Sequence, residues 1–413
     1  MSRGNVTVIG AGMVGICCAS YLQRAQYQVT VIDPLSPGSA CSFGNAGVIA
    51  PGACLPLAMP GIWRQVPGFL IDPLGPLSIR WRDLGRSFPW LIDWLRTSSP
   101  GEARRISAAM RSLHRPAFDC LEPLLRDAGA ADLITRNGQL YVSSRRDAVL
   151  GSPLAVDLLR EAGVRTEHLG PDEVRQLEPA LGAVRSGLLF PDNGHATNSY
   201  RVVQRLAEHV VQRGGTIVAD KVTGFDIADG DVTAVIGATG RYPAGAIVVA
   251  AGAWSDRLAA QLGTKVRLIA ERGYHVTAAD PGAMPNRVIS HVDHRVAITP
   301  MDIGLRIAGT VEIAGVDAPP NFARAKKLVE IGRAVMPRAG LDTVTEWMGP
   351  RPSVPDGLPV IDRSPHLGNV IYAFGHSHYG FMGGAPTGRL VAELLAGEPP
   401  FIDSKPFALA RLA

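Results

Sequence analysis

The segment that most constrains this chain lies at its start, between Asn5 and Asp33. A short β-branched run is followed at once by Gly10-Ala-Gly12-x-x-Gly15, then by apolar residues at helical spacing, and then by a second strand that ends in Asp33. A strand, a glycine-rich turn, a helix and a strand with an acidic end, all within about 30 residues, form the dinucleotide-binding fingerprint. We therefore expect an adenine dinucleotide to bind here.

Each part of this fingerprint has a physical role. Gly10 makes the tight turn, Gly12 lets the backbone approach a pyrophosphate, and Gly15 lets helix and strand pack closely. Free N–H groups and the dipole at the helix start attract phosphate, and Asp33 is expected to accept hydrogen bonds from ribose hydroxyls. No second fingerprint with this spacing opens a nicotinamide domain further along the chain. The expected cofactor is therefore FAD alone.

Length and composition narrow the class of protein. The 413 residues are enough for about two domains, and a net charge of +4 without a long basic run argues against nucleic acid as a partner. No run of 18 uninterrupted apolar residues predicts a membrane span. The five cysteines are odd in number and lack Cys-x-x-Cys spacing, which argues against a disulfide framework or a metal site and favours the cytoplasm. The apolar N-terminus contains three glycines and ends in an acidic strand, so it is interpreted as mature fold rather than as a signal peptide.

Two segments outside the fingerprint favour a functional interpretation. Residues 34–47 form a long stretch of small residues, which suits close backbone approach to a flat ring better than a flexible surface loop. Residues 51–96 contain four tryptophans and predict a short amphipathic helix. The favoured interpretation is core of a second domain, and the alternative is a membrane-surface anchor.

The remaining pattern predicts alternating helices and strands. Helices are expected over 102–128 with a bend at Pro116, and over 155–162, 171–181, 200–213, 322–335 and 387–396. The 322–335 helix is interpreted as a solvated basic face. Strands are expected over 138–142, 246–250, 272–278, 287–292, 295–299, 304–308 and 370–374, with a small sheet over 216–219, 222–227 and 232–236.

Several motifs taken together resemble one family. They are the first fingerprint, Ser42-Phe-Gly-Asn-Ala-Gly47, Val249-Ala-Ala-Gly-Ala-Trp-Ser255, Arg272-Gly-Tyr-His275, Arg306-Ile-Ala-Gly-Thr-Val-Glu312, Met348-Gly-Pro-Arg-Pro352, Pro355-Asp-Gly-Leu-Pro359 and Gly375-His-Ser-His-Tyr-Gly380. In this combination the chain is similar, over nearly its whole length, to the FAD-dependent amine oxidoreductases of the D-amino-acid oxidase, glycine oxidase and sarcosine oxidase type. The nearest resemblance is to bacterial D-amino-acid dehydrogenases.

The resemblance implies an α/β fold (α+β overall) of two domains. A discontinuous Rossmann-like FAD-binding domain is expected over residues 1–55, 195–270 and 355–413. A substrate-binding domain of antiparallel sheet and helices is expected over 56–194 and 271–354. Fingerprint and resemblance together give the expected cofactor-binding residues: Gly10, Gly12, Met13, Val14, Gly15, Asp33, Pro34, Ser42, Asn45, Ala46, Gly47, Val222, Ala251, Gly252, Gly375, Gly380, Phe381 and Met382. Within this set, the Asn45–Gly47 loop and the Gly380–Met382 turn would flank the isoalloxazine, and the Ala251–Gly252 turn would support the ADP half.

The substrate site implied by the resemblance centres on Arg351. Its Gly-x-Arg-Pro pattern resembles the one that carries the family's carboxylate-binding arginine, and a planar guanidinium pairs bidentately with a carboxylate. Tyr274, His378 and Tyr379 are expected to contact substrate, and no residue is assigned as catalytic. Two departures from the family pattern concern substrate preference: Asp362 replaces a frequent glycine, and His376-Ser-His-Tyr379 replaces a different tetrapeptide.

The predicted reaction is oxidation of an amino acid, favouring a D-amino acid, with transfer of hydride from Cα to flavin N5 and hydrolysis of the imine to a 2-oxo acid. One alternative is oxidation of a cyclic or N-substituted amino acid, such as proline, hydroxyproline, sarcosine or an opine. A second alternative is a non-catalytic FAD subunit of an oxidase complex.

Met382 stands where some sarcosine oxidases carry a lysine, which favours the dehydrogenases and a quinone or electron carrier over oxygen as the acceptor. The expected location is the cytoplasm, with peripheral contact on the inner face of the membrane as an option.

Overall fold

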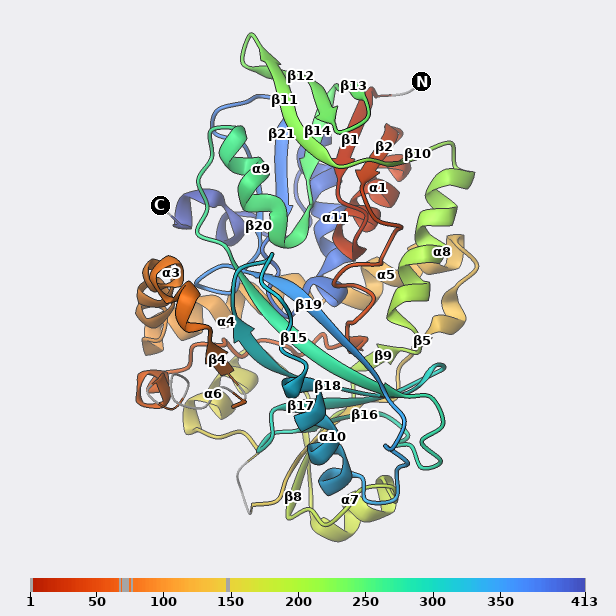
Figure 1. Ribbon diagram of the computed structural model, residues 1–413, viewed down its shortest axis with the longest axis vertical. Helices are drawn as coiled ribbons and strands as arrows, with labels where there is room; N and C mark the ends of the chain where they lie inside the picture. Colours follow the sequence, from red (N-terminus) through yellow and green to blue (C-terminus); the bar gives the residue numbers. More distant parts are fainter. Residues whose placement is uncertain (1–2, 67, 69–73, 76, 146–148, 413) are drawn as a thin grey trace.

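The computed structural model describes residues 3–66, 68, 74–75, 77–145 and 149–412. Its strands form two main layers (Figure 1): a parallel sheet in the upper half of the view and a larger mixed sheet in the lower half. Chain segments that are far apart in sequence build both layers. A cofactor or substrate between them therefore meets residues from the whole chain.

The upper sheet has six strands and contains the fingerprint. Its strands are parallel except for β20, which runs antiparallel at the edge. In spatial order they are β10 (Thr216–Ala219), β2 (Gln28–Asp33), β1 (Asn5–Ile9), β14 (Ala246–Val249), β21 (Val370–Phe374) and β20 (Val360–Arg363). The predicted strand–helix–strand unit and the strands near 246–250 and 370–374 are thus confirmed.

Helices α1 (Met13–Arg24), α8 (Ser199–Gln212) and α11 (Gly380–Ala396) cover one face of this sheet. Glycine makes the close contacts possible. A Cβ at Gly15 would lie 1.9 Å from the Gly10 carbonyl oxygen, and a Cβ at Gly388 would lie 2.5 Å from the Cys17 carbonyl oxygen. Cys17 and Cys18 lie in this core.

The closing helix begins earlier than predicted. Gly380, Phe381 and Met382 form its first turn rather than a turn before it. The glycines and Pro386 of this segment favour a break by propensity, yet Gly384 and Gly388 let α11 lie directly on α1. Tertiary packing therefore overrides the local preference.

The lower sheet has nine strands. It is antiparallel except for two parallel pairs, β16 with β6 and β18 with β4. Its strands are β19 (Thr345–Ser353), β15 (Ile269–Ala278), β18 (Gly304–Ile313), β17 (Val296–Met301), β16 (Val288–His291), β6 (Gln139–Ser143), β8 (Ser186–Phe190) and β7 (Glu167–Leu169) in order, with β4 (Leu77–Ile79) beside β18. The predicted antiparallel strands between 272 and 308 are confirmed, whereas β19 was not predicted because prolines flank Arg351 on both sides.

Two small sheets complete the strands of the described residues. One consists of β11 (Val222–Ala228), β12 (Asp231–Gly237) and β13 (Arg241–Pro243), and the other of β3 (Val48–Ile49), β9 (Gly194–Ala196) and β5 (Ile134–Thr135). The prediction that residues 216–219 belong to the small sheet was wrong. The strand they form follows α8 and returns parallel to β2, as a helix crossover on a sheet requires.

The remaining helices lie around these sheets. They are α3 (Leu84–Arg96), α4 (Pro100–His114), α5 (Ala117–Asp127), α6 (Pro153–Glu161), α7 (Pro171–Leu177), α9 (Ser255–Gln261) and α10 (Ala323–Val335), with short 3₁₀ turns at Ile62–Gln65, Trp81–Asp83, Ala131–Leu133, Gly252–Trp254, Lys405–Phe407 and Leu409–Leu412. The predicted bend at Pro116 separates α4 from α5. Both helices pack into the core shared by α1 and α11. The exact domain boundaries stay a prediction.

The prediction of a solvated basic face on α10 was wrong for Arg324. This side chain is fully buried and donates hydrogen bonds to Ser78 Oγ at 2.8 Å and Thr310 Oγ1 at 3.1 Å. A cation at this position fastens α10 to the end of β18 instead of facing water. Charge alone did not reveal this, because a buried arginine and a solvated one look alike in sequence.

The tryptophan-rich segment combines core and surface. Trp90 and Trp94 of α3 are buried, as the core interpretation predicts, whereas Trp63 and Trp81 are 59% and 67% exposed. Residues 67, 69–73 and 76 of this segment lie outside the described part of the chain. Within the described residues, no helix is both long enough and apolar enough to cross a bilayer.

Candidate functional site

A cavity of about 1090 Å³ lies between the two layers. The upper wall is formed by the fingerprint, the residues that follow it and the turn after β14, and the lower wall by β15, β18 and β19. Eighteen of the predicted site residues line it: Gly10, Gly12, Met13, Val14, Asp33, Pro34, Ser42, Asn45, Ala46, Val222, Ala251, Gly252, Arg351, His378, Tyr379, Gly380, Phe381 and Met382. The structure thus brings together residues that were singled out across 373 sequence positions.

Four predicted residues do not line the cavity: Gly15, Gly47, Gly375 and Tyr274. The three glycines support its walls from behind. Gly15 packs α1 on the turn at Gly10, while Gly47 and Gly375 adopt φ angles of +72° and +82°, which L side chains rarely adopt. In this structure they shape the backbone of the walls, and their predicted contact with the cofactor stays a prediction.

The turn at the fingerprint has the geometry that its sequence predicts. Gly10 has a φ of +113°, and a Cβ there would lie 2.4 Å from the Ala250 carbonyl oxygen. A Cβ at Gly12 would meet only Ser42 Oγ, at 3.6 Å, so the space in front of Gly12 is open. Met13 N–H donates to Ser42 Oγ at 2.9 Å. The first turn of α1 has no acidic residue, and its N-cap Gly12 has no side chain to cap the helix, which leaves a positive helix end for an anion.

Asp33 closes the same turn from the end of β2. One carboxylate oxygen accepts the Ala11 N–H at 2.7 Å and the other accepts the Leu35 N–H at 2.8 Å. Burial raises the pKa of Asp33, and the two backbone N–H groups oppose that shift. The carboxylate therefore lies in the cavity wall in a fixed orientation, where hydroxyl groups of a ligand can reach it.

The small-residue segment after β2 is fastened to the lower sheet. Arg306 of β18 donates from Nη1 to the carbonyl oxygens of Phe43 at 2.9 Å and Asn45 at 2.7 Å. Thr299 Oγ1 donates to the Ala46 carbonyl at 2.9 Å. Arg306 is 2% exposed, and burial lowers its pKa to about 10. The segment is therefore an anchored wall of the cavity, in line with the functional interpretation.

Arg351 lies on the lower wall, on β19, directly opposite Glu271 of β15. Its guanidinium occupies the space above Gly273, where a Cβ would come within 2.1 Å of Nη2. Nη1 donates to the Thr310 carbonyl oxygen at 3.4 Å. Burial lowers the pKa of Arg351, while the charge of Glu271 opposes this shift. The guanidinium keeps donor capacity that faces the cavity.

Thr310 has an unusual backbone for a β-branched residue, with a φ of +57°. It sits where the pairing of β15 and β18 slips past Gly273, which is a β-bulge. The bulge turns the Thr310 carbonyl toward Arg351 while its side chain accepts from Arg324. The local strain therefore coincides with the predicted carboxylate-binding residue.

His378 and Tyr379 follow β21 and line the cavity near Arg351. Burial, with the charge of Arg351 as a second cause, lowers the pKa of His378 to about 3. Its Nδ1 lies 3.5 Å from Oε2 of Glu271. Burial raises the pKa of Tyr379, whose ring lies 5.1 Å from that of His114.

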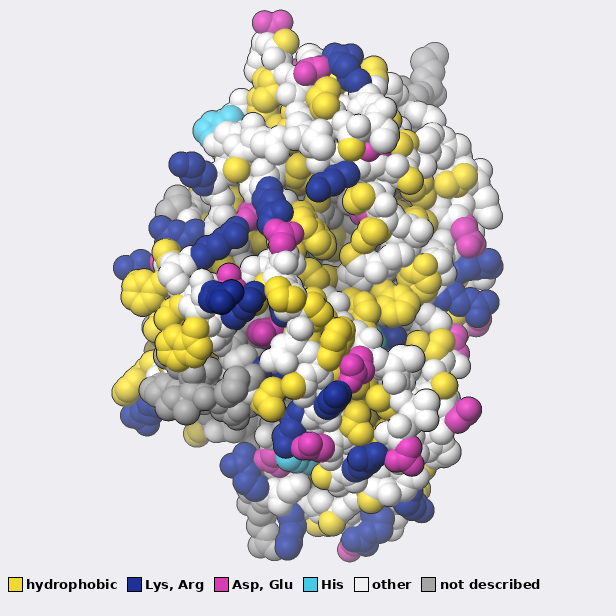
Figure 2. Space-filling model, viewed as in Figure 1, with side chains coloured by type: hydrophobic (Ala, Val, Ile, Leu, Met, Phe, Trp, Pro, Cys, Tyr) yellow, Lys and Arg dark blue, Asp and Glu magenta, His cyan; other side chains and the backbone are white. Residues whose placement is uncertain are grey.

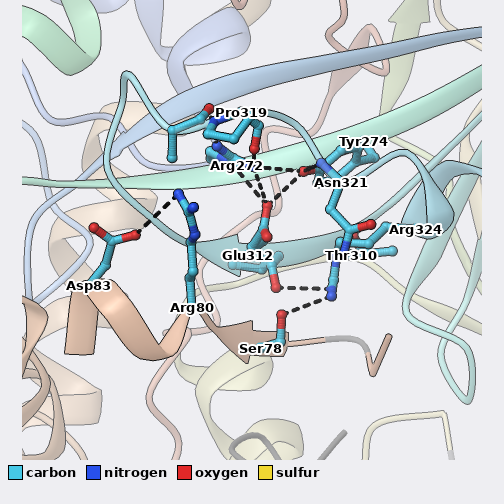
Figure 3. Close-up of polar contacts among 12 residues, drawn as sticks. Ser78, Arg80, Asp83, Arg272, Tyr274, Thr310, Glu312, Pro319, Asn321 and Arg324 are labelled. Atoms are coloured by element: carbon cyan, nitrogen blue, oxygen red, sulfur yellow. Dashed lines mark hydrogen bonds and ion pairs between the residues drawn. The ribbon is translucent and has the colours of Figure 1, made fainter. Parts of the chain in front are cut away.

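The structure does not bring Tyr274 to the cavity. Figure 3 shows its hydroxyl in a buried network instead: it donates to Glu312 at 2.6 Å and accepts from the Asn321 N–H at 2.9 Å. Arg272 completes the network with an ion pair to Glu312 at 2.6 Å. The motif that contains Tyr274 therefore fastens the loop after β18 to β15, and its neighbour Gly273 makes the room for Arg351.

Several cavity residues were not predicted from the sequence. Glu271 precedes the Arg272–His275 motif by one position and points into the cavity from a buried strand. Trp347 stacks on His275 with ring centroids 5.1 Å apart and covers Gly44 and Gly349. Lys221 and Arg257 line the cavity near β11 and α9. Strand alternation along β15 could have placed Glu271 on the same face as Gly273.

Residues 5–394 match the family model described as FAD dependent oxidoreductase, the DAO family. The chain belongs to this family. FAD is accordingly its cofactor, and the DAO family assignment confirms the resemblance, the fold class and the expected cofactor.

Three relatives of this DAO family member are named as enzymes that oxidise amino acids. It is 39% identical to a D-amino-acid oxidase of Bradyrhizobium diazoefficiens, with 98% of each chain covered. It is 31% identical to a D-amino acid dehydrogenase of the same organism, with 99% of each chain covered. Among solved structures, an L-proline dehydrogenase from P. horikoshii superposes with a TM-score of 0.75 at 19% identity, covering 99% of this chain and 98% of that one. The family model and the two sequence relatives together show that this protein catalyses an FAD-dependent oxidation of an amino acid.

The residues of the upper wall fit FAD. The open space before Gly12, the free end of α1 and the oriented carboxylate of Asp33 match a pyrophosphate and a ribose. Val222 and Ala251 line the same end of the cavity. When bound, FAD supplies the acceptor for a hydride, which protein side chains cannot provide. No cluster of three or more metal-binding side chains occurs among the described residues.

Proposed function

We propose that this enzyme oxidises the Cα–H bond of a D-amino acid. The observation that carries the proposal is Arg351, a partly buried guanidinium on the lower wall of the same cavity whose upper wall fits FAD. The names of the two Bradyrhizobium relatives support the D configuration. A guanidinium in this position would pair with the substrate carboxylate bidentately and set the direction of Cα.

The protein side chains mainly position the substrate and set the polarity around it. Arg351 lies above Gly273, donates to the Thr310 carbonyl beside it and stands opposite Glu271 in the strand pair. Such a fixed cation loses little conformational freedom when it binds a carboxylate. Trp347, Tyr379 and Met382 line the same cavity and offer largely apolar surface to a substrate. Hydrolysis of the imine to the 2-oxo acid needs only water.

Anaerobic bleaching of the flavin by an amino-acid panel tests the proposal. D-alanine is expected to bleach the purified FAD-loaded enzyme, whereas L-alanine is not. D-proline, hydroxyproline and sarcosine in the same panel test the alternative of a cyclic or N-substituted substrate. Bleaching by none of them would support the alternative of a non-catalytic FAD subunit and would overturn the proposal.

The predicted acceptor is a quinone or another electron carrier, and we propose that it is met at a membrane surface. Trp63, Trp81 and Phe88 are 59%, 67% and 57% exposed around α3, and the exposed cations Arg64, Arg82 and Arg86 lie among them. In Figure 2, hydrophobic and basic side chains gather side by side over this part of the molecule. Aromatic rings between cations suit the interface of an anionic bilayer.

Two measurements test this part of the proposal. The reduced enzyme should pass electrons to a short-chain quinone or an artificial dye much faster than to oxygen. The protein should also sediment with vesicles that contain anionic lipid, and less so at high salt because the attraction is electrostatic. Oxygen turnover equal to that with the dye, or no sedimentation, would favour a freely cytoplasmic oxidase.

A further inference from the structure

Two polar atoms that face each other in the cavity have no hydrogen-bond partner among the described residues. One is Oε2 of Glu271 and the other is Nδ1 of His378. They lie 3.5 Å apart, and both side chains line the cavity. Glu271 is 5% exposed, so its carboxylate is removed from water. Its ion-pair neighbour among the described residues is His378, which is not a cation when neutral.

The other buried glutamates of the protein behave differently. Glu312 accepts from Arg272 at 2.6 Å, and Glu178 accepts from Arg287 at 2.7 Å. Both belong to closed networks that hold loops in place. Among the buried glutamates of the described residues, Glu271 alone has a fully buried oxygen without a hydrogen-bond partner, and its side chain lines the active-site cavity. Because buried acceptors in proteins are normally hydrogen-bonded, we expect the bound ligand to supply the donor.

The position of Glu271 relative to Arg351 indicates which ligand that is. The two residues are direct cross-strand partners on β15 and β19, so their Cβ atoms are about 5 Å apart on one face of the sheet. A cation and an anion thus stand side by side on the cavity wall. An α-amino acid carries the complementary pair, a carboxylate and an ammonium group separated by a single carbon.

We propose that Glu271 and His378 form the ammonium site of the substrate and that Glu271 takes one proton from it before oxidation. This rests on the proposed function of the cavity. The substrate nitrogen donates one N–H to Oε2 of Glu271 and another to Nδ1 of His378, while Arg351 holds the carboxylate. One N–H bond breaks and an O–H bond forms on Glu271. The electron pair left on nitrogen becomes the second C–N bond as hydride leaves Cα for FAD.

The charges around the pair agree with this role. Burial raises the pKa of Glu271, with Arg351 and a hydrogen bond from Ser353 opposing the shift, so the carboxylate is a stronger base than an exposed one. His378 has a pKa lowered to about 3 and is a neutral acceptor at neutral pH. Other titratable groups also line the cavity: burial raises the pKa of Cys41, Tyr141 and Tyr379 and lowers the pKa of His291 and His376, so each of them favours its uncharged form. Arg351 is therefore the permanent charge beside the pair.

The substitution Glu271→Gln tests the proposal because it keeps the size and one oxygen but removes the base. The readout is the anaerobic rate of flavin bleaching by D-alanine, or by whichever panel member bleaches the wild type best. Near neutral pH the rate is expected to fall about 100-fold, which is typical of a lost general base. Above the pKa of the substrate's own ammonium group, the amine arrives neutral and the deficit should shrink to less than about tenfold. Glu346→Gln on β19, an exposed carboxylate outside the cavity, is the matched control and should leave the rate unchanged.

A binding measurement separates this role from a structural one. Propionate has the carboxylate but no amine, and its binding is followed by the change in flavin absorption. E271Q should bind propionate at least as tightly as the wild type, because Arg351 remains and a neighbouring negative charge is removed. His378→Asn should slow bleaching less than E271Q, by about tenfold, and should also leave propionate binding intact.

The outcomes distinguish this proposal from the proposed function. If no amino acid bleaches the wild type, the function of the cavity is wrong. If the wild type is bleached but E271Q matches it, or shows one deficit at all pH values, or loses propionate binding, then Glu271 is no base and only this inference falls. If E271Q does not retain FAD, the same pH comparison and propionate titration on H378N decide the matter.

Discussion

The two walls of the cavity are built in different ways. The centre of the upper wall comes from one short segment, in which Gly10, Gly12 and Asp33 lie within 23 residues of each other and backbone N–H groups hold the Asp33 carboxylate. The lower wall sets Glu271, Arg351 and His378 side by side through the register of β15 with β19 and the turn after β21. The upper wall is a local motif that a sequence displays directly. The lower wall exists only once a whole sheet has formed.

The largest effect is expected at the lower wall. Arg351→Ala should reduce kcat/KM for the best amino acid about 1000-fold, or about 4 kcal/mol, since it removes the only charged carboxylate partner inferred here. Arg351→Lys is the matched variant: it keeps the charge but loses the fork, and is expected to recover only a small part of the loss. Both variants should retain FAD, which absorbance of the purified protein checks. Loss of FAD from either would contradict the separation of the walls.

A pair of glycine substitutions tests the upper wall. Gly15→Ala would force a Cβ to within 1.9 Å of the Gly10 carbonyl, so it should lower the free energy of unfolding by about 3 kcal/mol. Gly12→Ala meets only ordinary contact at 3.6 Å, so the fold should survive while FAD affinity falls. Chemical denaturation and FAD titration measure the two effects. Equal stability losses in both variants would contradict the distinction between packing and ligand approach.

Acid should act on the buried histidines of both layers, since burial lowers the pKa to about 4 for His114 and His195. Burial lowers the pKa to about 3 for His275, His376 and His378, below the ordinary 6.5 of histidine. Between pH 6.5 and pH 3 the unfolded chain therefore binds protons that the folded chain does not bind. The free energy of unfolding falls as pH falls through this range. At pH 5 this amounts to about 2 kcal/mol for each such histidine.

Denaturation at pH 7 and pH 5 measures this loss. His376→Gln should reduce the difference between the two pH values, whereas His366→Gln, at an exposed position, should leave it as it is. An unchanged difference in H376Q would mean that this buried imidazole takes up its proton without unfolding.

The smallest effect is expected for Tyr274, which lies outside the cavity in a network that supports it. Tyr274→Phe removes a hydroxyl that serves Glu312 and Asn321, so stability should fall by about 1 kcal/mol. The rate of flavin bleaching should change less than about threefold, because the side chain does not line the cavity. A large loss of rate with normal stability would indicate that Tyr274 contacts the substrate.

Prediction from the sequence located cavity residues where the signal is local, and their roles stay predictions. The fingerprint, the small-residue segment and Arg351 were all identified from short motifs, and all line one cavity. It failed where distant packing decides. Arg324 appeared to be a surface charge, yet strands at residues 77–79 and 304–313 bury it. Glu271 gave no motif at all, because its meaning depends on Arg351, which lies 80 positions away and faces it only through strand pairing.

Asp362, a departure from the family pattern, shows how such a difference can be structural. Its carboxylate accepts the Leu409 N–H at 2.8 Å and so fastens the C-terminal segment to β20. The residue does not line the cavity. It therefore bears on the C-terminus rather than on substrate preference, whereas the His376–Tyr379 tetrapeptide is at the cavity itself.

The contact of Arg306 with the loop at Phe43 and Asn45 has a consequence for biosynthesis. The arginine follows Phe43 by 263 positions, so at about 5–20 residues per second the ribosome needs roughly ten seconds to a minute between the two. During that interval the nascent chain carries the glycine-rich turn that is expected to bind phosphate, but the loop after it is unanchored. Productive loading of the vitamin-derived cofactor must therefore wait until most of the polypeptide has emerged.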